Sequence, residues 1–98
     1  MMDRADWLRE RRPPAPEALR DAVRDALAHA GPGPIREAAD RASHACLADA
    51  LARPGRVRES AFALLTADAL VTYACEAALD EDDAVRALEL LLTIGDRP

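Results

Sequence analysis

The sequence predicts an all-α fold, a small bundle of four principal helices preceded by a short N-terminal helix. Three observations lead to this prediction. Apolar residues recur three and four positions apart over long segments, and glycine and proline fall at the boundaries of these segments. No alternation of β-branched residues bounded by hairpin turns occurs, so no strand is expected. A chain of 98 residues suffices for one helical domain, residues 1–98.

Two helices are predicted in the first third of the chain. Asp3 is placed to cap a short helix over 4–11. Pro16 suits the first turn of an amphipathic helix over 16–30, whose outer face carries mixed charges. Its apolar stripe consists of Leu19, Ala22, Val23, Ala26 and Ala30.

The third predicted helix spans 34–52 and follows a Gly-Pro-Gly-Pro break over 31–34. It has two apolar sides. One side consists of Ile35, Ala38, Ala39, Ala42, Cys46 and Ala50, and the other of Leu47 and Leu51. One small bundle cannot easily bury both sides against itself.

The fourth predicted helix, 56–79, is expected to be central because it is apolar nearly all round. Its larger residues share a broad face made of Phe62, Leu65, Ala69, Tyr73 and Leu79, with Leu64 and Val71 at the margin. The back of the helix carries Ala63, Ala67, Ala74 and Ala78, small residues that let a second backbone approach closely.

The acidic run Asp80-Glu81-Asp82-Asp83 is expected to separate this helix from a fifth one over 81–94. A continuous helix would turn Val85, Leu88 and Leu92 away from Leu65 and Leu79, which favours a break. Leu90 and Ile94 would stay in phase, so a continuous helix remains the alternative.

Alanine dominates the composition and changes what the hydrophobic fraction means. Hydrophobic residues make up 50% of the chain, but 23 of them are alanine and 13 are leucine. The predicted core is therefore thin, with helices in close approach across alanine faces. A lone copy is then less self-sufficient than the hydrophobic percentage suggests.

Charge and length exclude several classes of function. A net charge of −5 and three aromatic residues argue against binding of nucleic acid. Uninterrupted apolar runs fall short of the ~18–20 residues that cross a bilayer, so no membrane span is predicted. The first twelve residues lack the apolar core of a secretory signal, and two cysteines do not make a disulfide scaffold. The predicted location is the cytoplasm.

A polar stripe on the fourth helix is the first candidate for a ligand site. Asp68, Thr72 and Glu76 are spaced four residues apart, which places them along one side of the helix. The two carboxylates lie about 12 Å apart along the axis, too far to act on one bond. A solvated or salt-bridged stripe is the simpler interpretation, and a polar pocket is the alternative.

The loop before the fourth helix is a candidate anion site. Arg53, Arg56 and Arg58 stand next to free N–H groups of a helix start. The simpler interpretation is a charged turn that docks on the acidic segment 80–83 of the same chain or of another copy.

No catalytic residue, metal site or cofactor is predicted. Asp40 and His44 lie four residues apart, but Cys46 points almost opposite to His44 on a straight helix, so they form no ligand set. Cys46 and Cys75 sit in apolar segments, and neither serine lies in a Gly-x-Ser-x-Gly motif.

The surplus of apolar faces favours a non-enzymatic protein-interaction module, either a homodimer or a small accessory subunit of an assembly. The alternative is a bundle that binds a small molecule or ion at Asp68, Thr72 and Glu76. An enzyme ranks third, since no catalytic arrangement can be named.

Overall fold

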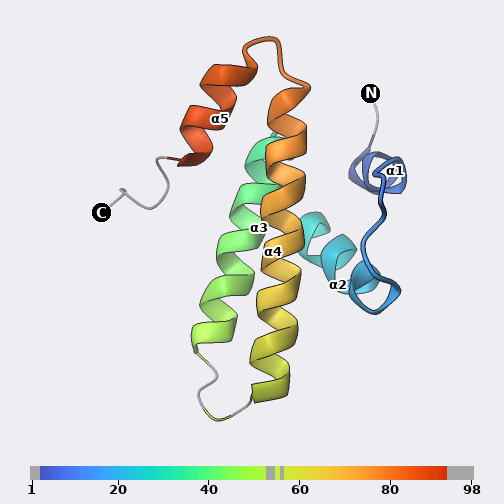
Figure 1. The fold of residues 1–98 in the computed structure, drawn as a ribbon, viewed down its shortest axis with the longest axis vertical. Helices are drawn as coiled ribbons and strands as arrows, with labels where there is room; N and C mark the ends of the chain where they lie inside the picture. The colour runs from blue at the N-terminus through green and yellow to red at the C-terminus, as the bar shows by residue number, and fades with distance from the viewer. Residues whose placement is uncertain (1–2, 53–54, 56, 93–98) are drawn as a thin grey trace.

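The computed structural model describes residues 3–52, 55 and 57–92 and confirms the all-α fold (Figure 1). It contains no strand within these residues. The helices are α1 (Arg4–Arg9), α2 (Glu17–Ala28), α3 (Ile35–Leu51), α4 (Val57–Leu79) and α5 (Ala84–Leu92). They differ from the predicted segments at their ends. Pro16 and Pro34 are N-cap residues rather than first-turn residues.

A long antiparallel hairpin of α3 and α4 forms the body of the molecule (Figure 1). The contact faces of both helices are rich in alanine. On α3 they include Ala38, Ala39 and Ala42, which are at most 2% exposed. On α4 they include Ala63, Ala67, Leu70, Ala74, Ala77 and Ala78, a set that we call the alanine face. The predicted close approach across small residues is therefore present.

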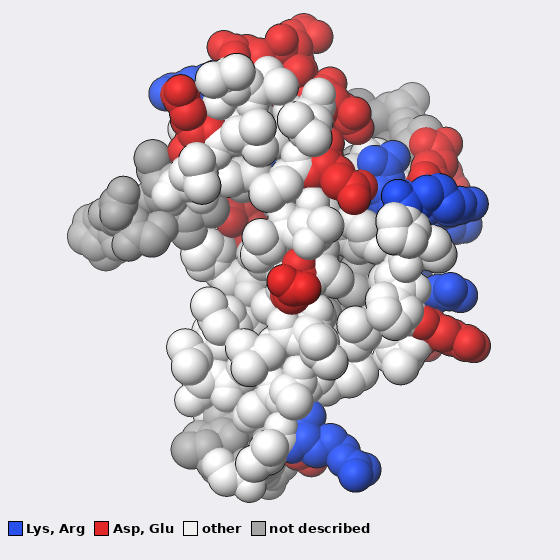
Figure 2. Space-filling view, viewed as in Figure 1, with Lys and Arg blue, Asp and Glu red and all other residues white. Residues whose placement is uncertain are grey.

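The acidic segment after α4 ends one helix and starts the next. The Asp83 carboxylate accepts a hydrogen bond from the Arg86 backbone N–H (3.0 Å), which caps α5 and confirms the predicted break. The Arg36 guanidinium meets Glu81 at 2.5 Å and anchors this segment to the start of α3. Figure 2 shows acidic side chains gathered at this end of the molecule.

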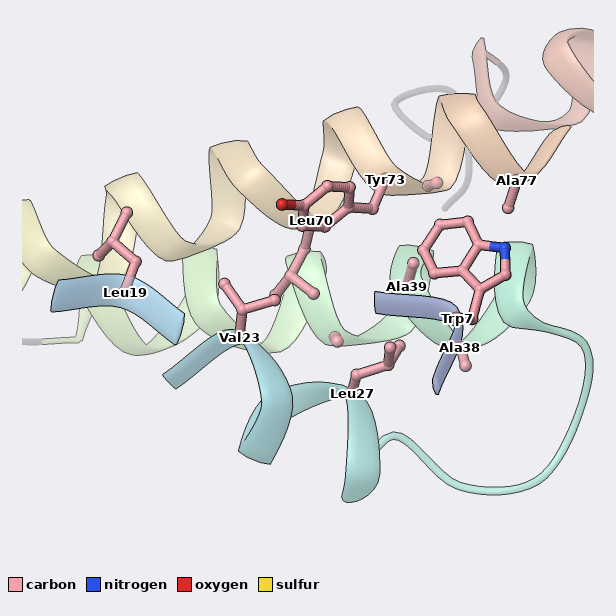
Figure 3. Packing of buried hydrophobic residues seen from close by; sticks show 11 residues of the cluster. Trp7, Leu19, Val23, Leu27, Ala38, Ala39, Leu70, Tyr73 and Ala77 are labelled. Atoms are coloured by element: carbon pink, nitrogen blue, oxygen red, sulfur yellow. The ribbon is translucent and has the colours of Figure 1, made fainter. Parts of the chain in front are cut away.

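Bulky residues from α1 and α2 cover one side of the hairpin (Figure 3). Leu19, Val23 and Leu27 project from α2 onto the alanines and Leu70. Trp7 of α1 makes an edge-to-face contact with Tyr73, with ring centroids 6.1 Å apart. Asp3 caps α1 as predicted, by accepting from the Asp6 backbone N–H at 2.8 Å.

Two arginines hold the α2–α3 connection, where Gly31 adopts a φ of +86° that favours glycine. Arg4 donates to the Leu27 carbonyl at 2.8 Å, and Arg41 donates to the Ala30 carbonyl at 2.7 Å. The two bonds add donors to carbonyls in the last turn of α2 and just after it, where regular helical hydrogen bonding ends.

The prediction that the bulky side of α4 faces the core is wrong. Leu64, Leu65 and Leu79 are 47%, 56% and 62% exposed, and Phe62 is 42% exposed. Of the predicted broad face, Tyr73 is buried and Ala69 is partly buried. α4 is central, because it contacts α2, α3 and α5, but it buries its alanines and leaves its larger side chains outside.

Candidate interaction surface

The exposed side of α4 follows a coiled-coil spacing. Its positions lie alternately four and three residues apart, which is the a/d pattern of a helix that packs along another helix. The positions are Val57, Ala61, Leu64, Asp68, Val71 and Cys75, which we call the heptad face. All of them are exposed except Cys75, which is partly buried. At 100° per residue, the centre of the heptad face lies about 110° around α4 from the centre of the alanine face.

Other large apolar side chains are exposed on the neighbouring helices. They are Leu47 and Leu51 of α3 and Val85 and Leu92 of α5, with 41% to 81% of each side chain exposed. Figure 2 shows one face of the molecule with very few charged atoms between the charged groups at its rim. The two apolar sides predicted for α3 are therefore real, since the alanines are buried while Leu47 and Leu51 are exposed.

One carboxylate stands within the heptad face. The side chain of Asp68 makes no hydrogen bond or ion pair within the part of the chain that the structure describes. Arg58, at the start of α4, is also exposed and has no such partner there. A carboxylate and a guanidinium are thus both left unpaired at this surface, about 15 Å apart along the axis at 1.5 Å per residue.

The three residues of the predicted polar stripe do not act together. Asp68 is unpaired, while the Thr72 hydroxyl donates to the Asp68 backbone carbonyl at 3.1 Å. The Glu76 carboxylate lies 3.5 Å from the Arg11 guanidinium, which itself stacks 4.0 Å from the Trp7 ring centre. The groove between α1 and α2 and the one beside Trp7 and Pro34 are lined by other residues than the stripe.

Of the predicted anion site, Arg53 and Arg56 lie outside the described residues. Arg58 opens α4, whereas the acidic segment 80–83 follows its other end, about 33 Å away at 1.5 Å per residue (Figure 1). The suggested docking of this loop on the acidic segment of the same chain is therefore wrong for Arg58. Arg36 and Arg11 meet that segment instead.

Titratable groups on α3 are arranged as surface pairs. His44 Nε2 lies 3.3 Å from an oxygen of Asp40, with His44 exposed and Asp40 partly buried. Among the described residues, no three His, Cys, Asp or Glu side chains gather as a metal site would require. Burial, followed by the nearby Asp49 carboxylate, raises the pKa of the Cys46 thiol, which disfavours the reactive thiolate.

A groove of about 540 Å³ lies between α1 and α2 and was not foreseen from the sequence. It is lined by Ala5, Leu8, Arg9, Arg12, Pro14, Ala15, Arg20, Val23, Arg24 and Tyr73. Arg9 and Arg24 pair with carboxylates three residues away. Arg12 and Arg20 donate to nearby backbone carbonyls. Within the described residues, Arg9 and Arg24 are thus paired with carboxylates, whereas Arg12 and Arg20 are bonded to uncharged carbonyls.

By length and composition, α4 is long and apolar enough to cross a membrane, with 23 residues and a mean hydropathy of 1.4. The sequence argument counted uninterrupted apolar runs, which Asp68 and Glu76 break, and so it overlooked this property. Of that segment, 44% is buried inside the protein, and core helices of soluble proteins have the same composition. The lack of a membrane span stays a prediction.

Comparison of the chain with protein-family models, curated proteins and solved structures finds no match.

The sequence reasoning missed the heptad face although its signal is present in the sequence. The 4-3-4-3-4 spacing from Val57 to Cys75 can be read directly. Because α4 is apolar on every side, side-chain size favours its bulkiest residues as the core-facing set and obscures this spacing. The pairing of Arg11 with Glu76 had no sequence signal, because 65 residues separate the two.

Proposed function

We propose that this protein is a non-enzymatic interaction module that self-associates through the heptad face of α4 and the adjoining leucines of α3. The observation that carries the proposal is the exposure of Leu64, Leu65 and Val71 on a helix whose alanine face is already packed. Contiguous apolar surface of this kind marks protein–protein contacts in soluble proteins. The proposal places the dimer in the cytoplasm, in keeping with the free thiols of Cys46 and Cys75.

Self-association supplies the burial that a single copy lacks. Within one copy, the largest fully buried side chains are Leu27, Leu70 and Val23, which is a small apolar interior. A second copy on the heptad face would remove Val57, Leu64 and Val71 from water, with about 25 cal/mol gained per Å² of apolar area buried. An accessory subunit would use the same surface, with a different chain as its partner.

Sedimentation equilibrium of the wild type and two variants tests the proposal. We expect the wild type to sediment as twice the 10.6 kDa chain mass at micromolar concentration. Leu64→Glu puts a charge on the heptad face and should give the single-chain mass. Ala45→Glu, at an exposed position of α3 outside this face, is the matched control and should remain dimeric. A wild type that stays at the single-chain mass would overturn the homodimer, and a complex with a different chain through this face would then indicate an accessory subunit.

A further inference from the structure

We propose that two copies pair through an antiparallel contact between their α4 helices, in which Asp68 of each copy forms an ion pair with Arg58 of the other. This arrangement rests on the self-association proposed above and specifies its partner, orientation and register. The contact uses residues 57–68, the half of α4 next to the α3–α4 connection. α5 lies beside the other half, so the proposed half is the more open one (Figure 1).

The heptad spacing and the charges select the same register. In antiparallel packing, a positions of one helix lie beside d positions of the other. When Val57 of one copy lies beside Asp68 of the other, Ala61 lies beside Leu64. Arg58 then flanks the Asp68 carboxylate of the partner helix, and the two-fold axis generates the same ion pair a second time. Both side chains are exposed and have no partner within the part of the chain that the structure describes, so neither has to give one up there.

The competing arrangements bring like charges together. A parallel pair in register places Asp68 beside its own copy. An antiparallel pair that overlaps along all of α4 does the same, because Asp68 is the midpoint of Val57–Leu79. Like charges across an interface are unfavourable, and more so when water is displaced. Both arrangements also leave Arg58 far from Asp68, so neither satisfies the unpaired groups.

A charge-swap experiment tests the ion pair. Asp68→Arg and Arg58→Asp each replace two attractive contacts by two repulsive ones, and each should weaken the homodimer at least about tenfold. An equimolar mixture of the two single variants restores complementary charges at both contacts. It should form a mixed dimer about as tight as the wild type, and so should the double variant R58D/D68R. Asp82→Arg reverses an exposed charge in the α4–α5 connection and is the control expected to leave affinity unchanged.

A neutral substitution gives a second test that does not depend on repulsion. Asp68→Asn removes both ion pairs and should weaken the dimer about threefold or more. If Asp68 instead faced apolar groups of the partner, the same change would remove an uncompensated charge and tighten the dimer. Dissociation constants from sedimentation, with melting temperatures to verify folding, give these values.

The outcomes separate the two proposals. Weakening of both single variants, together with rescue in the mixed dimer and in the double variant, supports the antiparallel register. In a parallel pair in register each single variant would keep two like-charge contacts, as the wild type has, and would not bind more weakly. A dimeric wild type without rescue, or with a tighter Asp68→Asn dimer, overturns the ion pair and leaves self-association standing. A monomeric wild type overturns both.

Discussion

The two sides of α4 differ in side-chain size and in what covers them. The alanine face meets α3 and α2 so closely that Ala74 and Ala78 are at most 2% exposed, while the heptad face leaves half of Val71 in water. The smaller residues thus form the interior, and the larger ones remain outside. This contrast shows that the fit between two alanine-rich helices, rather than the bulk of the side chains, decides which side of α4 is buried within one copy.

The largest expected difference between the two faces comes from truncating one leucine on each. Leu70→Ala opens a cavity at a fully buried site and should lower the free energy of unfolding by about 2–5 kcal/mol. Leu64→Ala should change it by less than about 0.5 kcal/mol at dilutions where copies are separate. Urea unfolding followed by circular dichroism measures both values. Equal losses at the two sites would mean that the heptad face is buried within one copy.

Enlarging a residue should likewise destabilise the protein more on the alanine face than on the heptad face. Ala74→Leu forces extra carbons between α3 and α4 and should cost about 1–3 kcal/mol. Val71→Leu, at a half-exposed neighbouring position, should stay within about 0.5 kcal/mol. Thermal unfolding of the two variants beside the wild type provides the comparison. If Ala74→Leu proved neutral, the close alanine contact would be refuted.

The contact of Arg11 with Trp7 of α1 and Glu76 of α4 should contribute less to stability. Arg11→Met removes the cation over Trp7 and the ion pair with Glu76 and should cost about 1 kcal/mol. Arg24→Met breaks an exposed pair with Asp21 and should cost at most about 0.5 kcal/mol. Urea midpoints rank the two changes. A larger loss for Arg24→Met would contradict the role assigned to Arg11.

Ionisation of the Tyr73 phenol should give the smallest of these effects on stability. Burial, followed by the nearby Glu76 carboxylate, raises its pKa above the ordinary 10.0. Above the unfolded pKa the unfolded chain loses the phenol proton first, so stability is complete below that pH and falls as pH rises through the folded pKa. For one proton, the free energy of unfolding falls by at most about 1.4 kcal/mol per pH unit. Tyr73→Phe should abolish this contribution in urea unfolding measured above pH 10. An unchanged slope in that variant would show that Tyr73 does not cause it.

Local signals in the sequence were sufficient for the helices but not for the orientation of α4. The Asp3 cap, the break before α5 and the burial of Leu19 and Val23 on α2 follow from spacing and capping, which depend on near neighbours in the chain. The predicted stripe of α2 omits Leu27, which is fully buried. The burial of α4 depends on which surface α3 offers, and a helix that is apolar on all sides gives no local signal for that choice. The unpaired state of Asp68 and Arg58 likewise emerges only when every neighbouring element is in place.

Methyl NMR across a dilution series tests the central claim most directly, since it reports on the two sides of α4 at once. The account predicts that the methyl signals of Val57 and Leu64 shift and lose contact with water as concentration rises, while those of Leu70 stay constant. If the Val57 and Leu64 methyl groups remain in contact with water at every concentration, no second copy covers the heptad face, and the account is contradicted.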